Sequence, residues 1–327
     1  MAPALVAFAV SLGVCAAFVR LPVGGRLLTR GSTGLRWRMD SVPVAGGLGM
    51  GAGFGVAVIL FGRDLPSVGA LCVAGYLGLA VGLWDDVRPM SPVAKLAGQV
   101  AAGVTFASLG ATIDLPGPDA LAWVVTVGWV VVATNAVNLL DNMDGVAAGC
   151  SLVAAVALFL WWSVGSGPAE LAAGLGGAVG GFLVLNFPPA RLFMGDSGSH
   201  FMGTLLAGLT IIDGGRAGSS GDAAVFAVLL VPALVLAVPL FDTALVTVER
   251  LRHGRPVWEG GRDHTAHRLE RAGLGVRSVV TTLWAVAAAT AGAATLAAVK
   301  GPWLVVAALA VAVTSIVAWR RLAAIEA

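Results

Sequence analysis

Long apolar runs, separated by short polar or Gly/Pro-rich breaks, make up most of the 327-residue chain. A helix needs about 20 apolar residues to cross the hydrocarbon core of a bilayer. The runs therefore predict an all-α, polytopic integral membrane protein with about 11 transmembrane helices in one domain, residues 1–327. The expected spans are 3–19, 42–61, 68–84, 95–113, 120–137, 146–164, 169–187, 199–212, 223–243, 279–299 and 302–319.

The distribution of lysine and arginine between the loops predicts the orientation of the chain, because cytoplasmic loops of membrane proteins are enriched in these residues. With the N-terminus outside, 17 of the 20 basic residues lie on the inner side, and Arg63, Arg216 and Lys300 lie outside. We therefore expect an external N-terminus and a cytoplasmic C-terminus. A cleaved signal peptide is the alternative for the first run. The positive charges follow this run instead of preceding it, which favours a retained span.

The composition excludes a soluble globular domain and argues against nucleic-acid binding. Hydrophobic residues make up 58% of the chain and charged residues 12%, whereas soluble domains carry roughly a quarter charged residues. The net charge is only +2, and no basic run is interleaved with aromatic residues, so we expect no nucleic-acid partner. Gly47, Gly51 and Gly55 recur at four-residue steps, which predicts a close contact between helices in lipid and not a dinucleotide-binding loop.

Polar residues gather in four clusters at the predicted inner ends of the apolar runs. An ionised aspartate at the centre of a membrane helix costs about 2.5–3.5 kcal/mol, so such groups usually face a cavity or a partner. The first cluster is Asp85-Asp86, followed by Lys95. Adjacent carboxylates repel one another and are tolerated where a positive group compensates them. A hydrated helix end, with Arg88 as an ion-pair partner, is the structural alternative.

The second cluster runs from residue 135 to residue 145. Asn135, Asn138 and Asp141 recur every three residues, which places two amides and a carboxylate on one face of a helix. Asp144 precedes a glycine and is typical of a turn or of the cap of the next span. A calcium-binding EF-hand loop is excluded, because the alternating acidic spacing and the terminal glutamate are missing.

The third cluster begins at Asn186 and ends before the eighth apolar run. Pro188 and Pro189 exclude a continuous helix at this point. Asp196 stands where an N-cap is the structural alternative to a functional carboxylate. Phe193 is equally typical of an anchor at the membrane interface.

The fourth cluster is the longest polar segment, residues 249–278, which we expect to form a cytoplasmic loop and part of an active site. It contains His264, His267 and Arg268. A positively charged inner loop explains the arginines but not the paired histidines. Zinc binding by the histidines would lack adequate third and fourth ligands.

All four clusters are predicted to emerge on the same side of the membrane. They provide carboxylate and amide oxygens, which suit a hard divalent cation, and basic side chains, which suit phosphate oxygens. Mg²⁺ usually takes one or two protein ligands and completes its shell with substrate phosphates and water. The chemistry indicated is phosphoryl transfer at the cytoplasmic membrane surface.

In order and spacing, the four clusters resemble those of the polyprenyl-phosphate N-acetylhexosamine-1-phosphate transferases, which are of the glycosyltransferase family 4 type. The resemblance covers nearly the whole chain. It rests on Asp85-Asp86 with Lys95, on Asn-Ala-Val-Asn-Leu-Leu-Asp-Asn-Met-Asp-Gly at 135–145, on Phe-Met-Gly-Asp-Ser-Gly-Ser at 193–199, and on the His-rich segment ending in Arg268-Leu269. It implies transfer of a phospho-sugar from a UDP-amino sugar to a membrane polyprenyl phosphate, with release of UMP.

The resemblance also implies a role for each matching residue. Mg²⁺, with Mn²⁺ as an alternative, would be held by Asn138 and Asp196. The catalytic group would comprise the paired acids beside the lipid phosphate and the basic residues that close over the diphosphate and sugar, namely Asp85, Asp86, His264, His267 and Arg268. The residues that bind substrate would be Lys95, which contacts phosphate, Asn135, Asp141, Asp144, and the uracil-contacting pair Asn186 and Phe193.

The resemblance is strongest to the branch that uses UDP-N-acetylglucosamine and undecaprenyl phosphate in a bacterial plasma membrane, as the first membrane step of cell-envelope polysaccharide synthesis. The element Pro239-x-x-Asp242-Thr243 and the order His-x-x-His-Arg-Leu are similar to that branch, although Ala266 stands where it commonly carries a histidine. Asp40 stands near a position where relatives tend to carry a basic residue. UDP-N-acetylmuramoyl-pentapeptide or another UDP-N-acetylhexosamine is the alternative donor, and a homodimer is left open.

Two reaction routes and two rival functions remain. The lipid phosphate is mostly dianionic at about pH 7, so direct attack on the β-phosphorus, with Asp85 or Asp86 as base or organiser, is favoured over a two-step route through an aspartyl-phosphate. An intramembrane aspartyl protease would use Asp196 but would leave the basic residues and amides unexplained. A secondary transporter with an aspartate relay predicts ionisable groups near mid-span, whereas these acids gather at one face.

Overall fold

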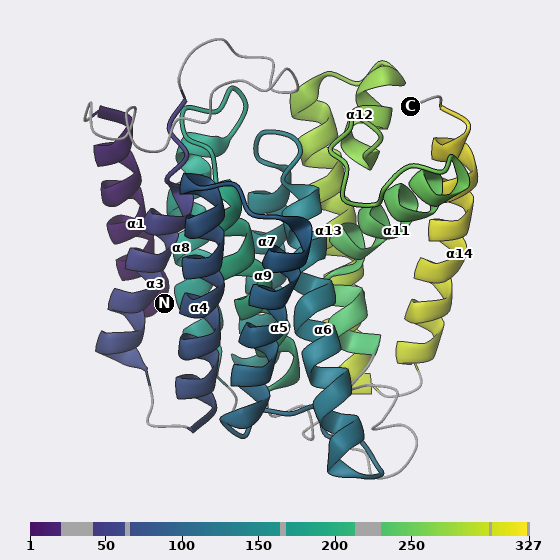
Figure 1. Ribbon diagram of the computed structural model, residues 1–327. Coiled ribbons are helices and arrows are strands. Elements are labelled where there is room, and N and C mark those ends of the chain that lie inside the picture. The colour runs from purple at the N-terminus through teal and green to yellow at the C-terminus, as the bar shows by residue number, and fades with distance from the viewer. Residues whose placement is uncertain (21–41, 63–65, 164–167, 213–229, 301–302, 326–327) are drawn as a thin grey trace.

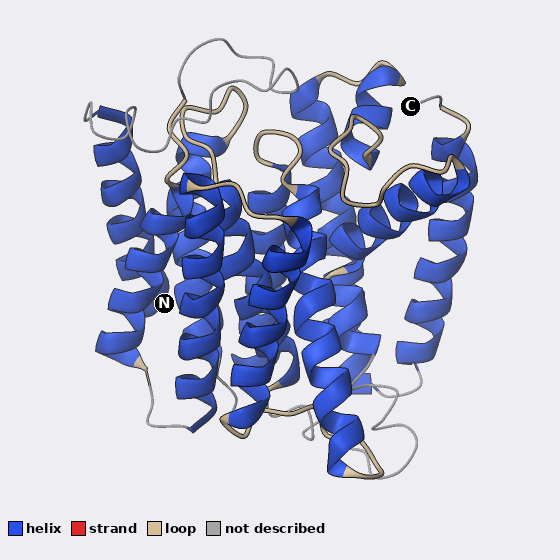
Figure 2. Cartoon of the chain, in the orientation of Figure 1, coloured by secondary structure: helices blue, strands red, loops and turns tan. Residues whose placement is uncertain are grey.

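The computed structural model describes residues 1–20, 42–62, 66–163, 168–212, 230–300 and 303–325. Within these ranges the chain forms helices joined by loops and contains no strand (Figure 2). The helices are α1 (Ala2–Arg20), α3 (Gly46–Phe61), α4 (Pro66–Val87), α5 (Pro92–Ser108), α6 (Asp119–Leu140), α7 (Val146–Ser163), α8 (Ala169–Asn186), α9 (Gly195–Ile211), α11 (Ala237–Arg252), α12 (Thr265–Arg271), α13 (Val276–Lys300) and α14 (Trp303–Ala323).

The prediction of an all-α membrane protein is confirmed at the level of architecture. Six of the described helices, α1, α4, α6, α7, α8 and α13, are long and apolar enough to cross a membrane. Apart from the ninth, each expected span overlaps a helix whose ends lie within about five residues of the expected ones. The count of eleven spans and the sides on which the termini lie stay predictions.

The ninth expected span, 223–243, differs most from the structure. Its first residues lie outside the described ranges, and the predicted end at Thr243 is wrong, because α11 begins at Ala237 and continues to Arg252. Figure 1 shows α11 lying across one end of the bundle instead of along it. Between Thr243 and Gly254 the sequence contains no glycine or proline, and the φ of Gly254, +64°, is the left-handed conformation that commonly ends a helix. The sequence therefore becomes polar after Thr243, while the helix itself continues to Arg252.

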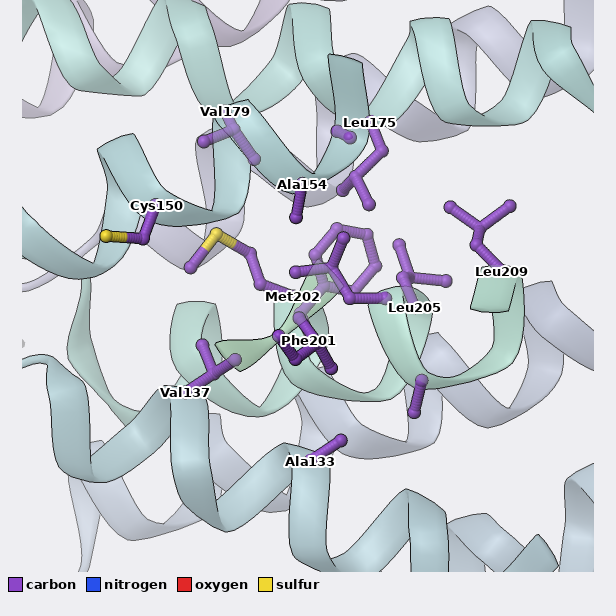
Figure 3. Packing of buried hydrophobic residues seen from close by; sticks show 14 of the residues in the cluster. Ala133, Val137, Cys150, Ala154, Leu175, Val179, Phe201, Met202, Leu205 and Leu209 are labelled. Carbon is purple, nitrogen blue, oxygen red and sulfur yellow. The ribbon is translucent and has the colours of Figure 1, made fainter. Parts of the chain in front are cut away.

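Helix α9 occupies the centre of the bundle. Every residue of α9 except Asp196 is buried, and the helix packs closely against α3, α4 and α6. Figure 3 shows the apolar side chains around it, which come from α6, α7, α8 and α9 itself: Ala133, Val137, Cys150, Ala154, Leu175, Val179, Phe201, Met202, Leu205 and Leu209. The N-terminus of this central helix is thereby fixed in position by its surroundings.

The predicted close helix contact at the glycine repeat is confirmed. A Cβ on Gly47 would meet the backbone of Gly198 in α9, and a Cβ on Gly51 or Gly55 would meet side chains of α4. Gly82 of α4 lies equally close to the backbone of Asp196. Glycine at 47 and 82 lets α3 and α4 approach α9 at backbone distance, and glycine at 51 and 55 makes room between α3 and side chains of α4.

The four polar clusters lie at the same end of the bundle. Figure 1 shows the α4–α5 connection, the end of α6, the α8–α9 connection and α12 at this end, together with the described C-terminal end of the chain. The segment 249–278, expected as a loop, holds the last turn of α11, the short helix α12 and the start of α13. The chemistry-bearing residues are thus presented at one surface of the bundle.

Candidate active site

Five predicted site residues meet in one carboxylate cluster, composed of Asp85, Asp86, Lys95, Asn138 and Asp196. Lys95 Nζ lies 2.8 Å from Asp196 Oδ2 and 3.2 Å from Asp85 Oδ2. Asn138 Nδ2 donates a hydrogen bond of 2.7 Å to the other oxygen, Asp196 Oδ1. Residues up to 111 positions apart in the sequence therefore share one site, while the chemical role of each stays a prediction.

Helix α5 begins where it does because of two residues just before Lys95. Ser91 caps the helix, its Oγ accepting a hydrogen bond from the backbone N–H of Ala94 at 3.2 Å, and Pro92 suits the first helical position. This start places Lys95 in the first turn of α5, within reach of the end of α4. Asp85, near that end, accepts a further hydrogen bond of 2.6 Å from the N–H of Met90.

Asp86 binds the N-terminus of α9 through both carboxylate oxygens. The backbone N–H groups of Asp196 and Ser197 donate to Asp86 Oδ1 and Oδ2 at 2.8 and 3.0 Å. The first N–H groups of a helix lack partners within the helix and favour a negative charge. Gly195, with a φ of +74°, has no Cβ, and a Cβ there would meet Asp86 Oδ2. Asp86 therefore fixes the first turn of α9 and with it Asp196.

A pocket of about 870 Å³ lies near the carboxylate cluster, although none of the five cluster residues lines it, and its volume is within the size range of ligand pockets. Phe193 lines it three residues before Asp196, and Asp141 lines it three residues after Asn138. The pocket is lined by the predicted residues Asp141, Asp144, Asn186, Phe193 and His267, and by Asn142, Met143, Pro188, Pro189, Arg262, Glu270 and residues 275–278.

Two of the predicted substrate-binding residues also join the loops that form the pocket. Asn186 Oδ1 accepts a hydrogen bond of 2.9 Å from the N–H of Gly145, and its Nδ2 donates to the carbonyl of Leu192 at 3.0 Å. Asp144 Oδ2 accepts from the N–H of Ala190 at 2.9 Å. The turn after α6 and the connection between α8 and α9 are thereby held together, which gives the pocket a fixed wall.

Three charged residues of the pocket were missed at the level of sequence: Arg262, Glu270 and Arg277. Arg277 Nε donates to the carbonyl of Pro188 at 3.2 Å, and Arg262 lies 3.5 Å from Glu270 in an ion pair. In the sequence, both arginines indicate only the positive charge of an inner segment. Arg262 and Glu270 lie two and three residues from the paired histidines, which is a signal available in the sequence, whereas Arg277 lies ten residues after His267.

His267 is the one predicted basic catalytic residue that lines the described pocket. Its Nδ1 lies 3.7 Å from Glu270 Oε2. Burial lowers the pKa of His267, and the nearby His264 and Arg262 lower it further, while Glu270 opposes the change. This shift favours the neutral imidazole, which can accept a hydrogen bond.

His264 is held against α11 and does not appear among the residues that line the described pocket. Its Nδ1 lies 2.8 Å from Asp242 Oδ2, and the N–H of Thr265 donates to Asp242 Oδ1 at 2.6 Å. The Asp242 of the Pro-x-x-Asp-Thr element thus holds the start of α12. Ala266, in the place of the usual histidine, is buried in the apolar core.

Arg268 and Asn135 also bond elsewhere in the described structure. Arg268 is buried, and its Nη1 donates to the carbonyls of Leu322 and Ile325 at 2.9 and 2.8 Å. Asn135 pairs with Gln99, its Nδ2 donating to Gln99 Oε1. Their predicted contacts with substrate stay predictions. Asp40 lies outside the described residues.

The donor set of the carboxylate cluster fits a hard divalent cation. Lys95 Nζ contacts both Asp85 and Asp196, so these two carboxylates can face one cation, while Asp86 binds the backbone N–H groups of α9. Within the described ranges, no three His, Cys, Asp or Glu side chains form a ready-made metal site. Mg²⁺ suits such a site, since it draws few ligands from protein and the rest from phosphates and water.

Comparison with known proteins identifies relatives of this chain. Residues 68–213 match the family model described as glycosyl transferase family 4. A Streptomyces coelicolor protein with a provisional glycosyltransferase name is 36% identical over 258 residues, 76% of this chain and 59% of that protein. The decaprenyl-phosphate N-acetylglucosaminephosphotransferase of Mycobacterium leprae is 32% identical over 279 residues, 74% of this chain and 70% of that protein.

A relative from another branch is also similar. The phospho-N-acetylmuramoyl-pentapeptide-transferase of Moorella thermoacetica is 33% identical over 196 residues, which cover 52% of this chain and 61% of that protein. The chain thus spans between about three fifths and seven tenths of the length of these relatives. The matched family region, 68–213, contains the whole carboxylate cluster.

Proposed function

The chain belongs to glycosyl transferase family 4, the family of polyprenyl-phosphate N-acetylhexosamine-1-phosphate transferases, and from this premise we propose the reaction that it catalyses. It transfers N-acetylglucosamine-1-phosphate from UDP-N-acetylglucosamine to a membrane polyprenyl phosphate, undecaprenyl phosphate in the first instance, and releases UMP. The Mycobacterium leprae relative, whose name specifies N-acetylglucosamine, supports this donor. UDP-N-acetylmuramoyl-pentapeptide is the second candidate, because the Moorella thermoacetica relative carries that name.

The observation that carries the proposal is the carboxylate cluster beside a ligand-sized pocket at one end of an apolar bundle. Lys95 provides a positive charge at the cluster, and Arg262, His267 and Arg277 provide basic side chains at the pocket. Phosphoryl transfer depends mainly on positioning and on neutralising the charge of the phosphates. A soluble nucleotide-sugar and a membrane lipid can both reach such a place.

Mg²⁺ is the cofactor of this proposal, held by Asp196 and Asn138 with Asp85 close by. When bound, the ion would neutralise charge on the diphosphate of the donor. Asp86 holds Asp196 through the backbone, and Asn138 is held by its hydrogen bond to Asp196 and a second of 2.8 Å to Ser199 Oγ. The two proposed ligands therefore have fixed positions.

The direct route needs no proton to be removed before attack. A phosphate monoester has a second pKa near 6, so the lipid phosphate is mostly dianionic near neutral pH. One of its oxygens forms a bond to the β-phosphorus while the bond to the bridging oxygen breaks, and that electron pair leaves with UMP. Lys95 binds the attacking phosphate, and Asp85 holds the Lys95 side chain in position.

Asp86 is poorly placed to act as the nucleophile of a two-step route. Both of its oxygens accept backbone N–H groups, and phosphorylation of either oxygen would disrupt the hydrogen bond that this oxygen accepts. This arrangement supports direct attack and assigns Asp86 the role of an organiser. Recovery of a phosphorylated protein after incubation with UDP-sugar alone would overturn the direct route.

The reaction site is proposed to face the cytoplasm of a bacterial plasma membrane. The basis is the excess of lysine and arginine on the predicted inner side, together with the gathering of the four clusters at one end of the bundle.

The proposed reaction is tested by UMP release from purified protein supplied with polyprenyl phosphate. The donors are UDP-N-acetylglucosamine, UDP-N-acetylmuramoyl-pentapeptide and a further UDP-N-acetylhexosamine, each with Mg²⁺ and with a chelator. We expect Mg²⁺-dependent UMP release with UDP-N-acetylglucosamine.

Asp196→Asn should lower the rate of UMP release by about 100-fold or more without changing the unfolding midpoint greatly, and the exposed control Asp114→Asn should match wild type. Absence of UMP release with every donor would refute the proposal.

A further inference from the structure

A second polar layer lies directly beneath the carboxylate cluster, inside the bundle. It consists of Gln99 of α5, Asn135 of α6 and His200 of α9, of which Gln99 and His200 have no role assigned above. Gln99 and His200 are almost fully buried. Gln99 and Asn135 exchange hydrogen bonds through their amide groups, at 2.5 and 3.3 Å, and Gln99 Nε2 lies 3.0 Å from His200 Nε2.

Three of the four helices that form the carboxylate cluster, α5, α6 and α9, also supply this layer, at helical spacing. Gln99 follows Lys95 by four residues, and His200 follows Asp196 by four residues. Asn135 precedes Asn138 by three residues. Residues three or four positions apart lie on the same face of a helix. The second polar layer therefore joins α5, α6 and α9 about one helical turn below the residues of the carboxylate cluster.

The hydrogen bonds of this layer are mutually consistent and reach the cluster directly. His200 Nδ1 lies 2.8 Å from the carbonyl oxygen of Asp196, which only accepts hydrogen bonds, so Nδ1 carries the proton. His200 Nε2 then accepts from the Gln99 amide, whose oxygen accepts from Asn135. Each side chain uses the others as its partners. A shift of one helix along another would leave buried polar groups unpaired, which is strongly unfavourable inside a membrane.

We propose that Gln99 and His200 are positioning residues, which hold α5, α6 and α9 in the register at which Lys95, Asn138 and Asp196 converge. Neither side chain is proposed to touch substrate. Their effect on catalysis rests on the proposed function, whereas their effect on the position of Lys95 does not. Asn135 is left out of the tests, because it is also predicted to bind substrate.

The structure offers a matched control in a contact between α6 and α9 next to this layer. Thr134 of α6 and Thr204 of α9 contact each other through their hydroxyl groups at 3.3 Å, and both are buried. This contact joins two of the same helices but does not include α5, which carries Lys95. Replacing both hydroxyls by methyl groups in Thr134→Val/Thr204→Val keeps the shape of the interface and leaves neither partner unpaired.

The first experiment measures the reactivity of Lys95 and does not depend on enzymatic activity. The sequence contains only two lysines, Lys95 and Lys300, so acylation by an amine reagent can be followed at Lys95 by mass spectrometry with Lys300 as internal reference. We expect Gln99→Leu and His200→Leu to raise acylation of Lys95 severalfold, and Thr134→Val/Thr204→Val to leave it unchanged. Unchanged reactivity in both leucine variants would overturn the proposal.

The second experiment measures UMP release by the same variants. We expect kcat to fall by about 10- to 100-fold in each leucine variant, with little change in KM for the UDP-sugar, and the double variant to be no worse than the single ones. His200→Gln, whose amide can still meet Gln99, should recover most of the activity. Normal kcat in both leucine variants, or additive losses, would overturn the proposal.

Two further outcomes separate the causes of failure. If wild type releases no UMP with any donor, the proposed function fails while the Lys95 measurement still decides the positioning role. If a leucine variant does not yield folded protein, Gln99→Asn, which shortens the same side chain by one methylene, replaces it in both experiments. A Thr134→Val/Thr204→Val protein as impaired as the leucine variants would show a general packing effect and would also overturn the proposal.

Discussion

Two adjacent aspartates have different positions and different partners in the structure. Asp86 gives both oxygens to backbone N–H groups of α9, whereas Asp85 accepts from the N–H of Met90 and from Lys95. Asp86 therefore sets where α9 begins, and Asp85 sets where the ammonium group of Lys95 lies. A pair of identical neighbours in the sequence thus acts on two different helices.

Gly195→Ala should destabilise the protein and displace Asp196. The φ of Gly195 is +74°, a left-handed conformation that costs about 1–2 kcal/mol for a residue with a Cβ, and the added methyl would meet Asp86 Oδ2. We expect a lower thermal unfolding midpoint in detergent and a loss of UMP release. As a control, Gly128→Ala on the exposed side of α6 has open space around it and should stabilise the helix by up to about 1 kcal/mol. An unchanged midpoint for Gly195→Ala would contradict the cap geometry.

At the scale of elements, α11 and α12 are joined by buried charged groups. Arg250 donates two hydrogen bonds of 2.9 Å to Asp263, one from Nε and one from Nη2. Asp242 of α11 binds His264 and the first N–H of α12. Helix α12 has only seven residues, too few for stability on its own. The placement of α11 across the end of the bundle therefore determines where His267 lies.

The Arg250–Asp263 pair predicts a pH-dependent contribution to stability. Burial alone raises the pKa of Asp263, but the hydrogen bonds and charge of Arg250 outweigh it and lower the pKa to about 2. Because this value lies below the unfolded value of about 3.9, the ionised pair contributes about 2 kcal/mol above roughly pH 4, and this contribution is lost as the pH falls toward about 2. Thermal unfolding of wild type and Asp263→Asn from neutral pH downward measures it.

We expect Asp263→Asn to unfold at a lower temperature than wild type at neutral pH, and the gap to narrow as the pH falls through the acidic window. Asp114→Asn, which changes an exposed carboxylate, should show no such gap at any pH. A gap of constant size down to the lowest pH measured would show that the charge of Asp263 does not stabilise the fold.

At the scale of the whole molecule, the polar end contrasts with an apolar outer surface. Large apolar side chains are exposed on several helices, among them Leu5, Ile59, Val124 and Leu160. Such exposure is rare on a soluble protein but suits helices that face lipid. The polar clusters and their basic residues are gathered at one end, where the predicted orientation places the cytoplasm.

Cysteine labelling with a membrane-impermeant thiol reagent tests this orientation. Asp114 lies in the connection between α5 and α6, and Glu259 lies after α11, at the end that holds the clusters; both are exposed. We expect Asp114→Cys to be modified in intact cells, and Glu259→Cys only after permeabilisation. The variants are made in a Cys72→Ser background, since the other native cysteines are buried. The reverse labelling pattern would overturn the orientation.

The positions of most helices could be predicted from the sequence. Ten of the expected spans match helices because apolar runs and Gly/Pro breaks coincide with helix ends. The predicted end of the ninth span is wrong because α11 continues through charged residues that are buried with partners, such as Arg250 with Asp263. Hydropathy reports the polarity of a residue but not whether a partner will satisfy it.

The site was predictable as a set of residues and not as a set of contacts. Asp85, Lys95, Asn138 and Asp196 were grouped correctly, because carboxylates and bases at helix ends need one another. His200 was visible four residues after Asp196, yet its partner Gln99 lies on another helix, and only the packing of α5 against α9 brings the two together. Side-chain direction across helices is set by packing, which the sequence does not reveal locally.

The burial of α9 divides the protein into a part that tolerates change and a part that does not. Asp196, which would handle the phosphates, lies on the enclosed helix α9, and a single added methyl beside it, as at Gly82 or Gly195, would displace neighbouring backbone or side chains. The pocket wall comes largely from turns and from the short α12. The specificity for the sugar can therefore be changed by substitutions in this wall, while the residues of the carboxylate cluster are left unchanged.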